Sequence, residues 1–335
     1  MIIVHRQKAP ELAHTDGARV PPSAAYSSGP SETIPSDALW IDLFNPTAAE
    51  DRRCETHLGI DIPTRSDINY VEPAGSLYAE RGARYVSAQF ICDLDGSTAL
   101  GRATFILTAK SIVTVRYEES DAFNLFSRRL SDSDARDIQP ETILAGLINT
   151  IVDRTAHEIE VTDQRLDAVS TSVFGINETT ENHDLIFKEV LRALGEQSKR
   201  ISNIRESLVS LERVLLFLLP DYQASGIPAQ LRDDVRATLR DLQSLEEHAT
   251  FQTQKVQFLL DTTLGLINLE QSHIIKLFSV LAVIFMPPTL IASIYGMNFK
   301  NLPELDWTYG YPLAIALMAA SSALLYAYFR RKRWL

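Results

Sequence analysis

Two apolar segments close the sequence and differ from everything before them. They cover residues 277–294 and 312–329, each 18 residues long and free of charged side chains. As helices, each would be about 27 Å long, close to the roughly 30 Å hydrocarbon core of a bilayer. The pattern therefore predicts two transmembrane helices, and buried helices of a soluble protein are the alternative.

A long helical pattern leads directly into the first apolar segment. From residue 229 to residue 294 the apolar positions keep helical spacing, and the first proline is Pro287. At 1.5 Å per residue this helix would be about 100 Å long. Because a monomeric globule cannot cover such a helix, its apolar stripe predicts packing against other copies of the chain.

The residues before the long helix predict a mixed α/β domain followed by helices. Stretches rich in β-branched and aromatic residues are typical of strands, and they cover Ala38–Phe44, 84–92, 102–107 and 111–117. Asn45-Pro46-Thr47 is expected to open a helix, and two longer helical patterns follow at about 141–169 and 182–219. The predicted fold class is an α/β cytosolic domain, long helices that form a bundle with those of other copies, and two C-terminal transmembrane helices.

The same patterns divide the chain into successive parts. The expected parts are a loose lead-in (1–38), the α/β domain (39–130), an antiparallel helical pair (131–228), a stalk and pore helix (229–294), an outer loop (295–311), the second span (312–329) and a basic tail (330–335).

The distribution of charge predicts how the chain is oriented in a membrane, and the net charge argues against one class of partner. The chain has 32 Lys and Arg against 43 Asp and Glu, a net charge of −11, which argues against nucleic-acid binding. Basic residues nevertheless flank both apolar segments on one side, at Lys276 and at 330–333. Because basic flanks stay inside, both termini are expected in the cytoplasm of a bacterial-type inner (plasma) membrane. No secretory signal is recognised at the N-terminus.

No catalytic motif supports an enzyme. The chain contains no Walker A loop, HExxH or GxSxG, and its seven histidines are scattered. Cys54 and Cys92 match no metal or redox spacing, which suits a reducing cytosol. The sequence therefore favours a non-enzymatic protein without an organic cofactor.

Small and polar residues form a stripe on the first apolar segment. Ser272, Ser279, Met286 and Ser293 are seven residues apart, and Ala282 and Thr289 lie on nearly the same helix face. Such a stripe serves either close helix packing or the lining of a wet path. The stripe alone leaves both possibilities open.

The residues around the two spans resemble the CorA family of magnesium channels. Gly296-Met297-Asn298 follows the first span, as the signature of that family does, and Met286-Pro287-Pro288-Thr289, the loop around 302–307 and the Trp334-Leu335 ending also match. The resemblance is dense over about 257–335 and looser from Trp40, where Trp-Ile-Asp-Leu-Phe-Asn-Pro-Thr resembles the family's first strand and turn.

The resemblance implies a homopentamer in a lipid bilayer with a funnel of long helices. It would pass divalent cations, chiefly Mg²⁺ with Co²⁺ and Ni²⁺ as further candidates. Gly296, Met297 and Asn298 would form the selectivity filter, with the Asn298 carboxamides facing the ion. The expected pore-lining residues are Ser272, Ile275, Phe278, Ser279, Ala282, Met286, Thr289 and Ser293. Met286, Phe278 and Ile275 would make an apolar constriction that closes by dewetting.

The resemblance also implies regulation by cytosolic Mg²⁺ between subunits. Asp261 matches one acidic position, and either Asp93 or Asp95 would be its partner across the interface. Glu304 and Asp306 are candidate cation-concentrating charges of the outer loop. A basic collar, equally explained by membrane anchoring, would consist of Lys276, Arg330, Arg331, Lys332 and Arg333.

Two other functions compete with a magnesium channel. A zinc transporter of the related ZntB type carries Gly-Ile-Asn, so Met297 disfavours it. A membrane-tethered scaffold that conducts nothing would tolerate bulky apolar residues on the polar stripe.

Overall fold

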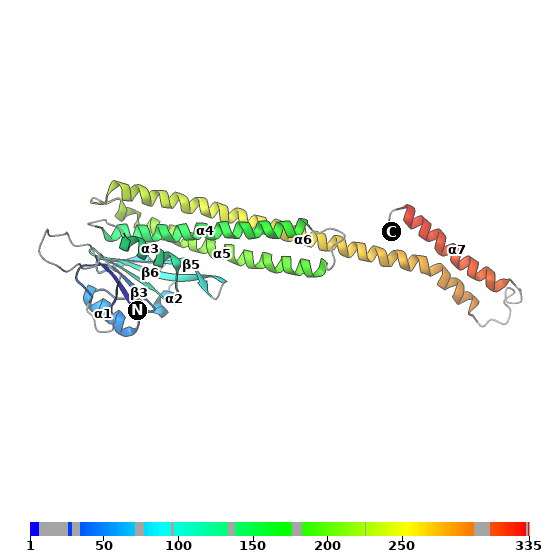
Figure 1. The fold of residues 1–335 in the computed structure, drawn as a ribbon, viewed down its shortest axis with the longest axis horizontal. Coiled ribbons are helices and arrows are strands. Elements are labelled where there is room, and N and C mark those ends of the chain that lie inside the picture. Colours follow the sequence, from blue (N-terminus) through cyan, green and yellow to red (C-terminus); the bar gives the residue numbers. More distant parts are fainter. Residues whose placement is uncertain are drawn as a thin grey trace. The chain divides into compact units, whose positions relative to one another are not determined.

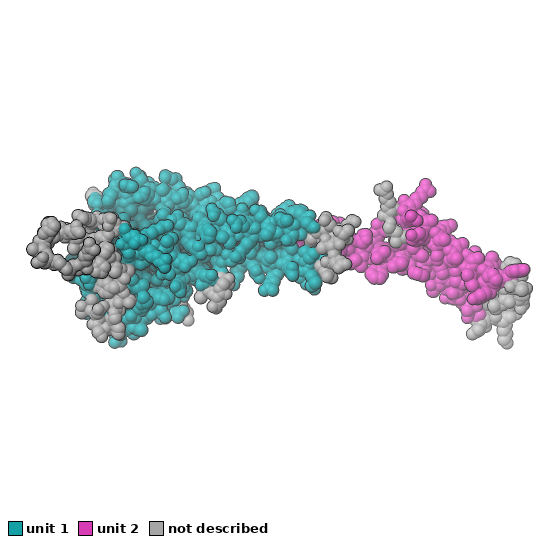
Figure 2. Space-filling view, in the orientation of Figure 1, with its two compact units in different colours: residues 1–259 teal, residues 260–335 magenta. Residues whose placement is uncertain are grey.

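The computed structural model describes residues 1–6, 26–28, 34–70, 77–94, 97–132, 138–175, 183–224, 226–297, 309–332 and 334. They form two compact units, residues 1–259 and residues 260–335 (Figure 2). The first unit carries a sheet and most of the helices, and the second carries the predicted membrane helices (Figure 1).

A seven-stranded sheet of order β2-β1-β3-β7-β6-β5-β4 organises the first unit. Neighbouring strands are antiparallel except for β3 and β7, which pair in parallel with Trp40 opposite Ile112. The strands are β1 (Ile2–Arg6), β2 (Tyr26–Ser28), β3 (Ala38–Phe44), β4 (Leu77–Glu80), β5 (Ala83–Leu94), β6 (Ser97–Leu107) and β7 (Ile112–Arg116). The four strands predicted from composition are confirmed as β3, β5, β6 and β7.

The first residues of the chain correct one expectation. The sequence assigned 1–38 to a loose lead-in, but Ile2–Arg6 form β1, which lies in the sheet between β2 and β3. Ile2 and Val4 are fully buried there. A pattern of five residues, followed by a segment rich in proline and glycine, is too short to predict a strand. Both strands that pair with β1 lie more than twenty residues further along the chain.

Helices cover both faces of the sheet. Cys54 of α1 (Ala48–Leu58) and Ile68 of α2 (Arg65–Tyr70) share a core with Ile41 and Leu43 of β3. On the opposite face lie α3 (Asp121–Asp132), α4 (Pro140–Phe174) and α5 (His183–Tyr222), with α4 and α5 side by side (Figure 1). The first unit is therefore a three-layered α/β/α structure.

The remaining helices are α6 (Ala229–Tyr295) and α7 (Gly310–Arg331). The predicted single helix over 229–294 is confirmed, because α6 is unbroken for 67 residues despite Pro287 and Pro288. The predicted helix start after Asn45-Pro46-Thr47 is also confirmed. Thr47 caps α1 by accepting a hydrogen bond from the Glu50 amide, while the Glu50 carboxylate accepts from the Thr47 amide at 2.8 Å.

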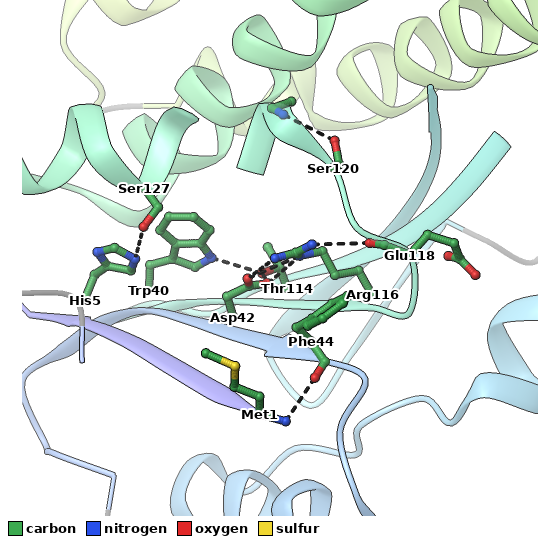
Figure 3. Close-up of polar contacts among 11 residues, drawn as sticks. Met1, His5, Trp40, Asp42, Phe44, Thr114, Arg116, Glu118, Ser120 and Ser127 are labelled. Carbon is green, nitrogen blue, oxygen red and sulfur yellow. Dashed lines mark hydrogen bonds and ion pairs between the residues drawn. The ribbon is translucent and has the colours of Figure 1, made fainter. Parts of the chain in front are cut away.

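A buried ion pair joins β3 to β7 (Figure 3). The side chains of Asp42 and Arg116 are each 3% exposed, and Arg116 Nη2 lies 2.8 Å from Asp42 Oδ2. Thr114 Oγ1 donates to Asp42 Oδ1 at 2.6 Å and accepts from Trp40 Nε1 at 3.0 Å. Every strong polar group in this network therefore has a partner, as burial of charge requires.

His5 extends this network from β1. Its ring stacks on Trp40 with centroids 4.5 Å apart, and Nε2 lies 3.1 Å from Ser127 Oγ. Burial lowers the pKa of His5 from 6.5 to about 4, although the nearby Asp42 charge acts in the opposite direction. His5 is therefore neutral in the folded protein at neutral pH.

This histidine is expected to make the first unit acid-sensitive. Because its folded pKa is lower than its unfolded pKa, the unfolded chain binds more protons, and stability falls as pH drops from about 6.5 towards 4. The loss approaches about 3 kcal/mol at the acid end. Urea unfolding followed between pH 7 and pH 4 measures it, and His5→Phe should remove that part of the slope. The same substitution at the exposed His157 should leave the slope unchanged, and an equal effect at both sites would contradict the prediction.

Candidate functional site

The second unit contains the helices that can cross a membrane. Among the described residues, α6 and α7 are long and apolar enough to do so. Only 6% of the apolar window in α6 and 11% of that in α7 are buried within the chain. A core helix of a soluble protein would be mostly buried, so these surfaces need lipid or other copies of the chain to cover them.

All eight predicted pore-lining residues are exposed on one face of α6. Ile275, Phe278 and Met286 are 65%, 66% and 66% exposed. At 100° per residue the eight positions fall within an arc of about 120°. The others are Ser272, Ser279, Ala282, Thr289 and Ser293.

The opposite face of α6 packs on α7. Val280 is 1% exposed, and Ile284 and Ile291, which share its face, are partly buried. Ser322 Oγ of α7 donates to the backbone oxygen of Ile284 at 3.4 Å. Because α7 occupies this face, the stripe of eight residues stays free for contacts with another copy or with water.

A proline pair explains the contact from Ser322. Pro288 has no N–H group, so it cannot donate to the carbonyl of Ile284 four residues earlier. Ser322 supplies the missing donor from α7, as neighbouring Ser and Thr side chains do for proline-containing membrane helices. No pattern around Ser322 predicts this role, although the Pro287-Pro288 pair indicates that a donor is needed.

Two hydroxyl groups of the stripe are bound to their own helix. Ser279 Oγ donates to Ile275 O and Thr289 Oγ1 donates to Phe285 O, each at 2.7 Å. With its proton used in this way, each hydroxyl presents only lone pairs to its surroundings. The stripe therefore offers hydrogen-bond acceptors, which suit the outward-pointing hydrogens of a hydrated cation and disfavour an anion.

The end of α6 is a tight turn. Gly296 N donates to Ala292 O at 2.9 Å, and Met297 N donates to Ile294 O at 3.2 Å. A Cβ atom at position 296 would lie 3.0 Å from Ala292 O, so the close backbone approach favours glycine here. The predicted filter residue Asn298 and the outer-loop acids Glu304 and Asp306 lie outside the described residues.

Basic and aromatic residues meet at the other end of the helix pair. Lys276 Nζ lies 5.3 Å from the centre of the Trp334 ring, so the start of the first span is next to the end of the second. This contact and the bond from Ser322 make the two spans an antiparallel hairpin, as predicted. Arg330, Arg331 and Lys332 are exposed beside Trp334, and Arg333 lies outside the described residues.

The predicted regulatory acids are exposed and lie in different units. Asp261 is on α6 in the second unit, and Asp93 is the second-last residue of β5 in the first, while Asp95 lies outside the described residues. Within the part of the chain that the structure describes, no group of three or more His, Cys, Asp or Glu side chains could hold a metal ion.

Asp93 borders a polar pocket of about 470 Å³ that contains arginines. Arg200 Nη1 binds Glu158 Oε2 at 2.9 Å, and both side chains are 13% exposed. Burial and the neighbouring Arg165 lower the pKa of Arg200, whereas Glu158 and Asp93 raise it. Asp93 is thus next to a fixed positive charge, which a bound cation would have to compete with or displace.

Sequence comparisons match most of the chain to one group of related proteins. A family model described as CorA-like Mg²⁺ transporter protein matches residues 35–331. "Magnesium transport protein CorA" of Yersinia pseudotuberculosis is 34% identical over 302 residues, which cover 90% of this chain and 93% of that protein. The protein of the same name from Haemophilus influenzae is 33% identical over 305 residues, 91% of this chain and 94% of its own length.

Solved structures with low identity share the fold. The CorA magnesium transporter of Methanocaldococcus jannaschii superposes with a TM-score of 0.77 at 19% identity, covering 100% of this chain and 99% of its own. The ZntB cytoplasmic domain of Vibrio parahaemolyticus gives a TM-score of 0.58 at 9% identity over 80% of this chain and 98% of that domain. At such identities the likeness concerns the fold alone.

Proposed function

The chain belongs to the CorA-like Mg²⁺ transporter family, and from this premise we propose that five copies form a passive, Mg²⁺-selective channel. The observation that carries the proposal is the exposed polar stripe of α6, opposite the face that α7 covers. Five such stripes facing a common axis would enclose a path lined by hydroxyl and small side chains, together with the apolar side chains of Ile275, Phe278 and Met286. Transport needs no enzymatic step.

The path suits an ion that keeps its water shell. Mg²⁺ dehydrates reluctantly, so neutral acceptor oxygens are better partners for its bound water than for the bare ion. The back-bonded hydroxyls of Ser279 and Thr289 are such acceptors, and Asn298 would add a ring of amide oxygens at the outer mouth. Glu304 and Asp306 would concentrate cations there. An inside-negative potential supplies about 4.6 kcal/mol per 100 mV for a divalent ion entering the cytoplasm.

Gating is proposed to combine an apolar ring with acidic interfaces. Ile275, Phe278 and Met286, each about two-thirds exposed, would form a constriction that excludes water when narrow. Cytosolic Mg²⁺ held between Asp261 of one copy and Asp93 or Asp95 of the next would keep the subunits together and the ring narrow. Lys276 with 330–333 would form a basic collar at the cytoplasmic end, with both termini inside.

Mg²⁺ uptake into proteoliposomes at imposed voltage tests transport, selectivity and gating together. We expect uptake that rises with inside-negative potential, competition by Co²⁺ and Ni²⁺, and inhibition when Mg²⁺ is raised on the side of the acidic domain. Absence of uptake would favour a non-conducting scaffold, and preferential Zn²⁺ uptake would favour a zinc transporter. Inhibition that persists in Asp261→Asn would remove that residue from the proposed regulatory site.

Filling the stripe is expected to block the path. Ala282→Leu adds bulk at an exposed stripe position, and fivefold repetition would narrow and dry the path, so we expect uptake to fall at least about tenfold. Ala316→Leu adds the same bulk at an exposed position of α7 and serves as the matched control. Equal uptake in the two variants would contradict a pore lined by α6.

A further inference from the structure

A pocket lined only by residues of the first unit is rich in arginine. It has a volume of about 290 Å³ and is formed by α2, β5, β6 and α5. Its lining includes Arg102 of β6 together with Arg205, Glu206 and Arg213 of α5. Three basic side chains against one acidic side chain make the lining net positive in a chain whose net charge is −11.

Several other arginines of the first unit are held by ion pairs. Arg84, Arg116 and Arg200 each form an ion pair with a carboxylate. Among the described residues, no such pair is found for Arg102, Arg205 or Arg213. With the single carboxylate of Glu206 against three guanidinium groups, the lining keeps an excess of positive charge that a bound anion would balance.

The walls of the pocket are fixed in place. Arg102 is half-buried, and its Nη1 donates to the backbone oxygen of Ile68 at the end of α2. On the other side, α5 is pinned to β5, because Gln89 N donates to Ser210 Oγ at 2.9 Å and Ser207 Oγ donates to Gln89 O at 3.1 Å. A ligand would therefore meet a preformed wall at Arg102 and β5, while the exposed side chains of Arg205 and Arg213 would be ordered on binding.

The lining also has an apolar part, which narrows the class of ligand. Ile68 and Ala88 are buried at the pocket wall, and Val209 lies on α5 midway between Arg205 and Arg213. Guanidinium groups bind phosphate through paired hydrogen bonds and also stack on flat rings. A phosphate joined to a flat, weakly polar body matches both parts. At about 290 Å³ the pocket is at the small end of the roughly 300–1,000 Å³ range of ligand sites.

We propose that this pocket binds a nucleoside monophosphate, with the phosphate on the arginines and the base against Val209. The site is independent of the proposed ion path, since none of its residues lies in the second unit. It would give the cytosolic unit a binding activity for a phosphorylated small molecule in addition to cation transport.

Calorimetry with adenosine monophosphate on the purified full-length protein tests the site. This probe binds Mg²⁺ weakly and leaves the cation sites undisturbed. We expect saturable binding in the micromolar to submillimolar range that weakens with added salt. The double variant Arg205→Gln/Arg213→Gln should weaken binding at least about tenfold, because it removes two charge-assisted contacts. Arg192→Gln, on the same helix but in an exposed pair with Glu196, should bind like the wild type.

Three results would overturn the proposal. The first is no binding of adenosine monophosphate at millimolar concentration, and the second is equal binding by the double variant and the wild type. The third is that inorganic phosphate binds as tightly as adenosine monophosphate, which would show that the nucleoside contributes nothing to the affinity. Because Arg205 and Arg213 are exposed, the double variant should keep the wild-type melting temperature and Mg²⁺ uptake. Absence of Mg²⁺ uptake by the wild type and the variants alike would instead count against the proposed channel without affecting the binding result. Failure of the nucleotide site and failure of the channel are therefore distinguishable.

Discussion

Replacing Asn298 by alanine is expected to lower Mg²⁺ uptake about a hundredfold while the channel still assembles. The substitution removes an amide oxygen from every copy at the proposed outer mouth. Two or three lost hydrogen bonds to the water shell, at about 1–1.5 kcal/mol each, raise the entry barrier by roughly 3 kcal/mol. Uptake into proteoliposomes measures the loss, and size-exclusion chromatography checks the assembly.

The loop itself provides a matched control for Asn298. Asn301 carries the same side chain three residues later, outside the Gly-Met-Asn triplet. Asn301→Ala should retain most of the uptake if the amide ring is specific to position 298. Wild-type uptake by Asn298→Ala would show that the filter lies elsewhere, and an equal loss in both variants would indicate a general effect on the loop.

The helical membrane part was predictable because its signals are local. Length and apolarity alone mark 277–294 and 312–329, and the helical spacing that predicts α6 over 229–294 is carried by neighbouring turns. The exposed stripe on α6 follows from the same periodicity. The packing of α7 against the opposite face of α6 does not follow from this periodicity, because the hydrogen bond from Ser322 to Ile284 joins residues 38 positions apart.

The parts that the sequence did not predict depend on distant partners. β1 is a strand because β2 and β3 flank it, and nothing within its five residues requires that conformation. The arginine pocket draws residues from four elements, so no spacing along the chain indicates it. For the predicted regulatory acids, the sequence named Asp93 as a candidate but could not reveal that Arg200 of α5 lines the same pocket.

Arg116→Met is expected to lower the free energy of unfolding of the first unit by about 3–5 kcal/mol, because it leaves a buried carboxylate without its ion-pair partner. It leaves the Asp42 carboxylate, which is 3% exposed, with Thr114 as its remaining hydrogen-bond donor in the network (Figure 3). It also removes the contacts of the guanidinium with the rings of Phe44 and Phe123, each 4.6 Å away. Trp40 lies in this network, so its fluorescence in a Trp307→Phe/Trp334→Phe background reports the urea midpoint.

The same substitution at an exposed pair separates burial from charge. Arg81 pairs with Asp61 at 3.0 Å, but both side chains are more than half exposed, so Arg81→Met should cost less than about 1 kcal/mol. Adding Asp42→Asn to Arg116→Met should recover part of the loss, because the unpaired buried charge is then absent while Thr114 keeps an acceptor. If Arg116→Met cost no more than Arg81→Met, or if the second substitution added to the loss, the pair would not be what holds β3 to β7.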